Sequence, residues 1–289
     1  MLTAKSYLFV PAIDIYRVPK AFEKGAAAVI IDLEDAVSEA VKIQSRQHVV
    51  DYLNQSTAQP VWIRINASTS HYQAGDMTLL KSLPVAALTN IVGLVLPKVE
   101  TSLDIERVRH ALGKPIIALI ETPVGIANSA EIAQAQGLMA LSYGFLDICE
   151  KLGVNADSEA GQMLGNQIRY QLLLYSKIYG LTAPIECVYP PFNNNEGLEK
   201  RVKFWQDLGF SGMLCIHPNQ VAIVNQLAKP TTEQLKFAQK VVDHYNATGL
   251  AAFAIDGQMV DTPVIVQAQK LLVQYNDSKQ LNQKQLNQK

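Results

Sequence analysis

Short apolar segments that resemble β-strands alternate with longer segments of helical spacing along most of this chain. Eight such apolar segments occur in succession, at residues 7–10, 28–33, 61–65, 93–96, 116–120, 140–143, 185–188 and 212–216. Near-continuous apolar strands alternating with amphipathic helices are typical of parallel strands that helices cover on their outer side. Eight such units predict a closed (β/α)8 TIM barrel. An open doubly wound sheet is the structural alternative, but no glycine-rich turn follows the first strand.

Helical spacing is found between most of these strands, at residues 38–53, 102–112, 124–135, 167–179 and 196–208. The third unit is the weakest, because residues 72–82 predict only a short helix. The polar stretch 149–165 contains three glycines, Asn155 and Asp157, so we expect an extended loop there. Long loops after barrel strands often cover an active site.

The pattern changes after residue 228, which we take as the end of a catalytic barrel domain spanning 1–228. Thr231 predicts the N-cap of a helix that runs to about residue 245. Residues 251–261 predict a hairpin that turns at Asp256-Gly257. A last helix begins near Pro263 and reaches about residue 275. This helix–hairpin–helix extension, 229–275, is too small to stand alone, so we expect it to pack on the barrel or on a neighbouring subunit. The tail 276–289 is rich in Gln, Asn and Lys and predicts disorder.

Composition excludes several classes of partner. The chain has 289 residues, 48% hydrophobic content, 18% charged residues and a formal net charge of −1, so nothing indicates nucleic acid or an anionic membrane as a partner. No apolar stretch approaches the roughly 20 residues that span a bilayer, and the first residues lack the apolar core of a signal peptide. The three cysteines, Cys149, Cys187 and Cys215, form no Cys-x-x-Cys pair, so we expect reduced, structural cysteines in a cytoplasmic enzyme.

Polar residues follow five of the predicted strands, where barrel enzymes carry their catalytic groups. A helix cap or a surface ion pair would explain any one of them, but five at the same rim indicate a site. They are Asp32, Glu34 and Asp35 after the second strand, Arg64 and Asn66 at the third, Pro97-Lys98 at the fourth, Glu121 after the fifth and Asp147 after the sixth.

Glu121 and Asp147 are the best candidates for metal ligands. They follow successive strands and are accompanied by no Cys or His, which favours Mg²⁺ or Mn²⁺ over zinc. Two carboxylates leave most of an octahedron to water and to substrate oxygens, such as those of a 2-oxo or 2-hydroxy acid. Arg64 is placed to hold the substrate carboxylate in a bidentate pair. A metal that polarises such a hydroxyl or carbonyl suits aldol-type cleavage.

Three other residues are weaker candidates. His217, at the end of the eighth strand, is best interpreted as a hydrogen-bonded structural residue. Lys98 could form a Schiff base, although an ion pair explains it more simply. Gly144 could let a ligand approach the backbone, and a tight turn explains it equally well.

Nine segments, in order over roughly residues 6–275, resemble the citrate lyase β-subunit-like (HpcH/HpaI aldolase/citrate lyase) family, which includes malyl-CoA and citramalyl-CoA lyases. Each segment alone is only weak evidence for the family, but all nine in this order are specific to it. They are Leu8-Phe-Val-Pro, Ile31-Asp-Leu-Glu-Asp-Ala-Val, Ile63-Arg-Ile-Asn, Leu96-Pro-Lys-Val-Glu, Ile120-Glu-Thr, Gly144-Phe-Leu-Asp, Leu208-Gly-Phe, Ile216-His-Pro-Asn-Gln and Gly257-Gln-Met-Val-Asp-Thr-Pro.

The resemblance implies roles for individual residues. Glu121 and Asp147 would bind Mg²⁺, Arg64 would contact the substrate carboxylate, and Asp261 would be an acid/base group that reaches a neighbouring subunit's site within a homotrimer. From local sequence alone, Asp261 would be a helix cap before Pro263. Glu34 and Asp35 would contact the metal-binding side chains and hold them in position without binding the metal themselves. The family's acyl-CoA contacts fall on Phe9, Tyr16, Lys20, Ile185 and Glu186.

The chain departs from the family at several positions on the CoA side. Ala12 stands where Gly is usual, Tyr16 where a basic residue is common, Met213 for a common Lys and Glu186 for a usual Asp.

We therefore expect a Mg²⁺-dependent carbon–carbon lyase that cleaves a 3-hydroxy-3-carboxy acyl-CoA, citramalyl-CoA or malyl-CoA, to acetyl-CoA and a 2-oxo acid, pyruvate or glyoxylate. Two alternatives stay open. One is the citryl-cleaving β subunit of a citrate lyase complex, which uses a carrier protein, and the other is a family member that binds acyl-CoA without turnover.

Overall fold

The first of two compact units is built on eight parallel strands. The computed structural model describes residues 4–286, and the chain divides between Ala228 and Lys229. The strands are β1 (Ser6–Pro11), β2 (Ala28–Asp32), β3 (Val61–Arg64), β4 (Ile91–Leu96), β5 (Ile116–Ile120), β6 (Leu138–Tyr143), β7 (Ile185–Glu186) and β8 (Gly212–Cys215). Each predicted strand is present, in order, so the (β/α)8 fold class is confirmed.

The sheet curves into a nearly closed barrel. Its strand order is β6-β5-β4-β3-β2-β1-β8-β7, and β1 pairs in parallel with both β2 and β8. The two ends of this order, β6 and β7, lie side by side. No ladder is formed between these two described strands, but the Thr182 backbone N–H donates to the Met139 carbonyl at 3.0 Å beside them.

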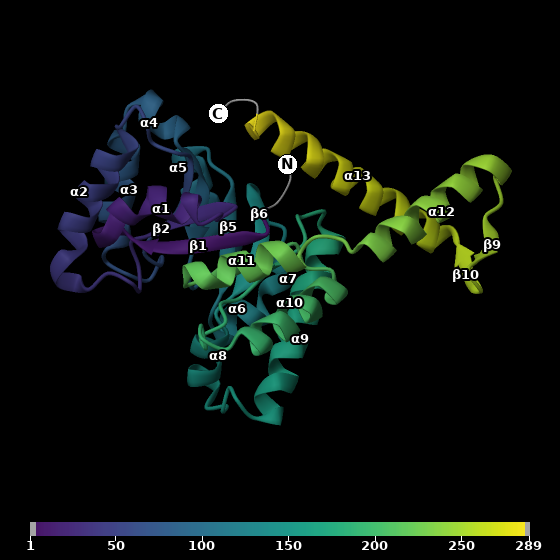
Figure 1. The fold of residues 1–289 in the computed structure, drawn as a ribbon. Helices are drawn as coiled ribbons and strands as arrows, with labels where there is room; N and C mark the ends of the chain where they lie inside the picture. The colour runs from purple at the N-terminus through teal and green to yellow at the C-terminus, as the bar shows by residue number, and fades with distance from the viewer. Residues whose placement is uncertain (1–3, 287–289) are drawn as a thin grey trace. The chain divides into compact units, whose positions relative to one another are not determined.

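Helices lie around the outside of this sheet (Figure 1). None of the helices within residues 4–286 is long and apolar enough to cross a membrane. The helical elements of the first unit are η1 (Ala12–Arg17), α1 (Val18–Glu23), η2 (Glu39–Val41), α2 (Lys42–Leu53), α3 (Gln73–Ser82), α4 (Val85–Thr89), α5 (Ser102–Leu112), α6 (Pro123–Ala127), α7 (Ser129–Ile132), α8 (Phe145–Leu152), α9 (Glu159–Ile178), α10 (Asn195–Leu208) and α11 (Pro218–Leu227).

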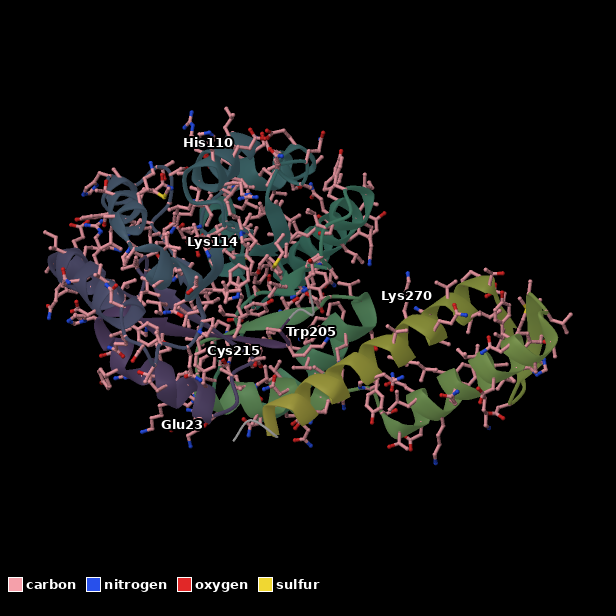
Figure 2. All side chains as sticks on the ribbon, turned by 90° about the horizontal axis from the view of Figure 1, so that it is seen from above. Glu23, His110, Lys114, Trp205, Cys215 and Lys270 are labelled. Carbon is pink, nitrogen blue, oxygen red and sulfur yellow. The ribbon has the colours of Figure 1, made fainter. Side chains whose placement is uncertain are left out.

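Alternation along the strands divides the apolar core into two layers. One set of side chains fills the barrel interior and includes Tyr7, Ile30, Trp62, Ile117 and Leu214. The other set packs between the sheet and the helices. Because both faces are covered, all five residues of β2 and of β5 are buried. Figure 2 shows this contrast in the first unit, where the labelled Trp205 and Cys215 are buried and Glu23 and His110 project from the surface.

The stretch 149–165 is not the extended loop that the sequence predicts. Helix α8 continues to Leu152 and α9 begins at Glu159, so only residues 153–158 connect them. The glycines that indicated a loop have a packing role instead. A Cβ on Gly161 would lie 2.4 Å from the Asn155 carbonyl oxygen, because the start of α9 packs closely on this connection.

The second unit has its own small core. It contains α12 (Thr232–Thr248), β9 (Ala252–Ile255), β10 (Gln258–Asp261) and α13 (Thr262–Leu286), packed around Val241 and Val260. The Thr231 hydroxyl accepts from the Gln234 N–H at 3.1 Å, which confirms the predicted N-cap. The predicted hairpin is also confirmed, with both central residues of its turn at positive φ, 49° at Asp256 and 79° at Gly257.

Helix α13 differs from the predicted disordered tail. It is continuous to Leu286, although the sequence predicts disorder from residue 276. Past Pro263 this segment has no glycine or proline, and its Gln, Lys and Leu residues are good helix formers, which explains the longer helix. Residues 287–289 of the predicted tail lie outside the described residues. Packing of the extension on a neighbouring subunit stays a prediction.

Candidate active site

The carboxyl ends of β2, β3, β4 and β5 bring charged side chains together. These strands are neighbours in the sheet, and Asp32 of β2 is paired in register with Arg64 of β3. Because the strands are parallel, the residues that follow them share one rim of the barrel. Asp147 reaches this rim from the first turn of α8 instead of from a strand end. The predicted convergence of Arg64 with Glu34, Asp35, Lys98 and Glu121 is therefore present.

Arg64 is held by Asp32 in a bidentate ion pair. Arg64 Nε lies 2.7 Å from Asp32 Oδ1, and Nη2 lies 2.6 Å from Oδ2. The guanidinium carbon also lies 4.7 Å from the centroid of the Phe9 ring. Burial acts to lower the pKa of Arg64, but the Asp32 charge outweighs it and the net pKa lies above the ordinary value. The bidentate pair that the sequence assigns to a substrate carboxylate is thus made with Asp32, and Nη1 points to Glu34 at 3.1 Å.

Lys98 contacts carboxylates through both its backbone and its side chain. Its ammonium donates to Glu34 and lies 3.4 Å from Asp35, while its backbone N–H donates to Glu121 Oε2 at 3.0 Å. Burial acts to lower the pKa of Lys98, but the hydrogen bond to Glu34 raises it above the ordinary lysine value. A protonated amine in an ion pair is a poor nucleophile, so the ion-pair interpretation is favoured over a Schiff base. The partner is Glu34 and not the nearby Glu100.

Glu121 is a buried carboxyl group in a negative environment. Its side chain is 4% exposed. Burial foremost, and then the charges of Glu34 and Asp147, raise the pKa of Glu121 to about 8, against the opposing charge of Arg64. Gly144 makes room for this carboxylate, since a Cβ there would lie 2.5 Å from Glu121 Oε1. The φ of Gly144 is −105°, so close packing explains the glycine, and a left-handed turn does not.

The donor set fits a divalent cation. Burial raises the pKa of Glu34, and Glu34 Oε2 accepts no well-aligned hydrogen bond although Arg64 is near. Among the described residues, five carboxylates, Asp32, Glu34, Asp35, Glu121 and Asp147, gather here with three basic side chains, Arg64, Lys98 and the nearby Lys42. A cation would offset the excess negative charge that burial makes unfavourable. Within residues 4–286 no group of three or more His, Cys, Asp or Glu forms a ready-made metal cage, so a cation here would keep positions for other oxygens.

The residues assigned to acyl-CoA are spread over several environments. Phe9 lies beside Arg64, whereas Tyr16 and Lys20 are exposed on η1 and α1. Ile185 is fully buried in the barrel interior. Their contacts with a CoA ester stay predictions.

Glu186 takes part in a buried network between the sheet and the helices. Its carboxylate accepts hydrogen bonds from Arg169 at 2.8 and 3.0 Å, Arg201 at 3.0 Å and the Tyr143 hydroxyl at 2.7 Å. Burial acts to raise the pKa of Glu186, but Arg169 and Arg201 hold it below the ordinary value. These partners fully occupy the carboxylate, which is 0% exposed, so this side chain offers no free group to a ligand in this structure.

Asp261 and His217 have local structural contacts. Asp261 ends β10 in the second unit, and its Oδ1 accepts from the Val264 N–H at 3.4 Å, as the helix-cap interpretation expects. Its acid/base role in a neighbouring subunit stays a prediction. His217 Nδ1 accepts from the Asn219 N–H at 3.2 Å at the start of α11, which confirms its structural interpretation.

The sequence does not reveal the roles of two residues that shape the site, Asp32 and Lys42. Asp32 stands out only as one of several acids, yet it is the main partner of Arg64; alternation along β2 and β3 could have indicated this, because both side chains face the barrel interior. Lys42, on α2, is buried and donates to the Leu33 and Glu34 carbonyls at 2.6 and 2.7 Å. No pattern around Lys42 predicts a buried ammonium that supports the turn carrying Glu34.

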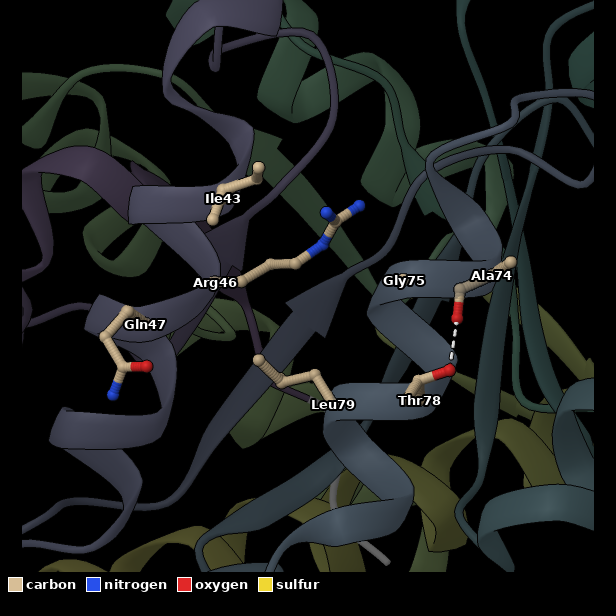
Figure 3. Close-up of a pocket in the computed structure, with 7 residues that line it drawn as sticks. All are labelled: Ile43, Arg46, Gln47, Ala74, Gly75, Thr78 and Leu79. Carbon is tan, nitrogen blue, oxygen red and sulfur yellow. Dashed lines mark hydrogen bonds between the residues drawn. The ribbon is translucent and has the colours of Figure 1, made fainter.

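A separate surface groove lies between α2 and α3 (Figure 3). Its volume is about 470 Å³ and its lining is mostly apolar, with Ile43, Gln47 and Leu79 among the residues. Arg46 extends across it to Gly75, whose missing side chain leaves room for the guanidinium. None of its lining residues belongs to the charged cluster at the strand ends.

The fold and the charged cluster define a (β/α)8-barrel protein with a cluster of acidic and basic side chains at the carboxyl ends of its strands. Residues 5–218 match the model of the HpcH/HpaI aldolase/citrate lyase family. The chain belongs to this family, as its sequence motifs indicate.

Relatives and a solved structure agree with this assignment. A citrate lyase subunit beta-like protein of Mycobacterium tuberculosis is 32% identical over 272 residues, which cover 92% of this chain and 93% of the relative. The human mitochondrial citramalyl-CoA lyase is 27% identical, over 92% of this chain and 83% of the relative. The crystal structure of the M. tuberculosis CitE protein in complex with magnesium, acetoacetate and coenzyme A superposes with a TM-score of 0.81 at 30% identity, covering 95% of this chain and 99% of that one.

Proposed function

We propose that this chain is a Mg²⁺-dependent carbon–carbon lyase that cleaves citramalyl-CoA or malyl-CoA to acetyl-CoA and pyruvate or glyoxylate. The observation that carries the proposal is the buried Glu121 carboxyl, whose pKa is raised to about 8 by burial and by neighbouring acids including Asp147. Such a group needs a cation to ionise at neutral pH. The magnesium, acetoacetate and coenzyme A bound to the CitE structure support this choice of metal and ligands.

Glu121 and Asp147 would hold Mg²⁺, with substrate oxygens completing its coordination. When bound, the metal polarises the substrate hydroxyl and carboxylate and stabilises charge on the oxygen atoms. Arg64, fixed by Asp32, would contribute its remaining N–H groups to the substrate carboxylate and so fix the orientation of the bond that breaks.

The cleavage needs two proton movements that balance. The bond between the hydroxyl-bearing carbon and the thioester's α-carbon breaks, and its electron pair stays with the α-carbon. The hydroxyl loses its proton as the carbonyl of the 2-oxo acid forms, and the α-carbon gains a proton to give acetyl-CoA. We assign the second transfer to Asp261, which the proposal takes from a neighbouring subunit of a homotrimer. The proton lost by the hydroxyl passes to water and replaces the one that Asp261 gives up, so the cleavage gains and loses no net proton.

Turnover with matched variants tests the proposal. Purified protein is incubated with Mg²⁺ and citramalyl-CoA or malyl-CoA, and pyruvate or glyoxylate is measured with and without EDTA. Glu121→Ala should abolish turnover, whereas Glu150→Ala, which removes an exposed glutamate from α8, should preserve it. Product formation from neither ester would contradict the substrate assignment. Cleavage only of a citryl group on a carrier protein would favour the citrate lyase subunit, and Mg²⁺-dependent turnover would exclude a non-catalytic binder.

Mixing two inactive variants tests the role of Asp261. If Asp261 acts in a neighbour's site, an equal mixture of Glu121→Ala and Asp261→Asn chains, unfolded and reassembled together, should regain activity. In a randomly mixed ring about a quarter of the sites would combine an intact Glu121 with an intact Asp261. No recovery in a mixed oligomer would contradict the inter-subunit arrangement.

A further inference from the structure

Lys98 has an unusual backbone conformation for a lysine. Its φ is 50°, in the left-handed region that side chains with a Cβ rarely adopt. Among residues 4–286, the other non-glycine residue with positive φ is Asp256, which lies in the tight β9–β10 turn. Lys98 lies in no such turn, since it follows β4 at the rim of the barrel. A backbone outlier at a charged rim calls for a functional reason.

The conformation diverts one backbone N–H away from the strand pairing. Leu96 is still paired with Ala118 of β5, and the Val99 N–H donates to the Leu119 carbonyl at 3.2 Å. Between them, the Lys98 N–H donates to the Glu121 side chain at 3.0 Å. The left-handed turn therefore supplies a donor to Glu121 in the middle of an otherwise paired segment.

The same residue sends its side chain to the opposite side of the cluster. The ammonium donates to Glu34 Oε1, while Glu34 Oε2 lies 3.1 Å from Arg64 Nη1. The Lys98 side chain is 24% exposed and that of Glu34 is 7% exposed, so this ion pair is largely shielded from water. Lys98 is thus linked to Glu121 through its backbone and to Arg64 through Glu34.

We propose that Lys98 is a two-ended positioning residue, whose N–H holds the metal ligand Glu121 and whose ammonium holds Glu34 against Arg64. The proposal rests on the function proposed above and adds the reason for the left-handed backbone. A glycine would relax the backbone and lose the ammonium. A lysine with ordinary φ would keep the ammonium and lose the N–H contact.

A graded set of substitutions separates the two ends. Asn tolerates the left-handed region, Ala less so, and the β-branched Thr least. All three substitutions remove the ammonium. They therefore differ mainly in how well they preserve the hydrogen bond from the backbone N–H of residue 98 to the Glu121 carboxylate. Lys151→Asn, on the exposed surface of α8, controls for the loss of one positive charge.

Calorimetric titration with Mg²⁺ measures the metal affinity, and so tests the backbone hydrogen bond to Glu121 without requiring turnover. We expect Lys98→Asn to bind Mg²⁺ no more than about threefold more weakly than the parent protein, Lys98→Ala more weakly, and Lys98→Thr at least about tenfold more weakly. The shift in Tm on adding Mg²⁺, measured within each variant, gives the same order even for a variant that starts less stable. If Lys98→Thr does not fold, the Mg²⁺ affinities of Lys98→Asn and Lys98→Ala still decide whether the backbone conformation matters. Equal affinities along the series would overturn the backbone role.

Steady-state kinetics reads out the ammonium end. Lys98→Asn should lose about 10–100-fold in kcat with its Mg²⁺ affinity retained, because Glu34 no longer fixes Arg64. Parent-like kcat in Lys98→Asn would overturn the side-chain role. If the parent protein binds no Mg²⁺, the proposed function fails together with this inference. If the parent binds Mg²⁺ and turns over while all variants behave alike, this inference alone fails.

Discussion

The raised pKa of Glu121 predicts that Mg²⁺ binding releases a proton. The ordinary value for glutamate is 4.5, and in this site burial and neighbouring acids raise the pKa of Glu121 to about 8. In the metal-free protein at about pH 7, roughly nine in ten molecules therefore carry the proton on Glu121. A coordinating carboxylate must be ionised, so binding at that pH releases about 0.9 proton at Glu121.

The size of the pH effect follows from the same value. Apparent Mg²⁺ affinity should rise roughly fifty-fold between about pH 6 and about pH 8 and then level off. Calorimetry at several pH values gives the affinity. Repeating the titration near pH 7 in buffers of different ionisation enthalpy counts the protons released. A dissociation constant that stays within about threefold over this range, with no proton release, would refute the assignment of the raised pKa to Glu121.

The free energy of unfolding of the metal-free protein should fall as the pH rises, whereas the Mg²⁺ affinity rises. Because the folded-state pKa of Glu121 lies above that of the unfolded chain, its contribution to stability is complete at acid pH and is lost as pH rises towards 8 and beyond. The loss is on the order of 5 kcal/mol above about pH 8. Urea unfolding of the parent and of Glu121→Gln isolates this contribution, since the amide does not titrate. Parallel pH profiles for the two proteins would contradict the prediction.

Three further substitutions test the site and its support. Gly144→Ala puts a Cβ 2.5 Å from Glu121 Oε1 and should weaken Mg²⁺ binding about 10–100-fold in calorimetry, with an unchanged circular dichroism spectrum; parent-like affinity would show that the carboxylate can shift freely. Arg64→Lys loses the bidentate pair with Asp32 and should lower the free energy of unfolding by about 1–3 kcal/mol and reduce kcat/KM, so an unaffected protein would contradict the pairing. Glu186→Gln leaves the buried Arg169 and the half-buried Arg201 without a counter-charge and should cost about 3–5 kcal/mol in urea unfolding while Mg²⁺ affinity is kept. A weakened Mg²⁺ affinity would show that this network reaches the metal site.

Much of the fold could be predicted because its signals are local. Each barrel strand is a short apolar run, and burial on both faces makes such runs visible without any knowledge of partners. The stretch 149–165 shows where local signals mislead. Gly161 indicates a loop by composition, but it lies in α9 at a point where the helix packs closely on the Asn155 carbonyl. A glycine chosen for close packing cannot be told from one chosen for a turn by sequence alone.

The convergence of acids and bases at the rim could also be predicted, but their pairing could not. Parallel strands bring their carboxyl ends to one edge, so Arg64 and Glu121 are expected at the same rim. Which carboxylate binds Arg64 depends on strand register and side-chain direction. Register and side-chain direction place Asp32 opposite Arg64. The carboxylate that pairs with Arg64 therefore belongs to the protein, whereas the sequence predicted a substrate carboxylate.

The sequence by itself determined the strand–helix alternation, the family motifs and the set of charged residues at the rim, because each depends on residue type and short-range spacing. Only the tertiary structure decided how those charges are shared. Burial of Glu121 beside other acids, the pairing of Arg64 with Asp32 and the left-handed backbone of Lys98 all depend on distances between strands that are far apart in the chain. Electrostatic interactions fall with distance and are strengthened by burial, and neither quantity is written in local sequence.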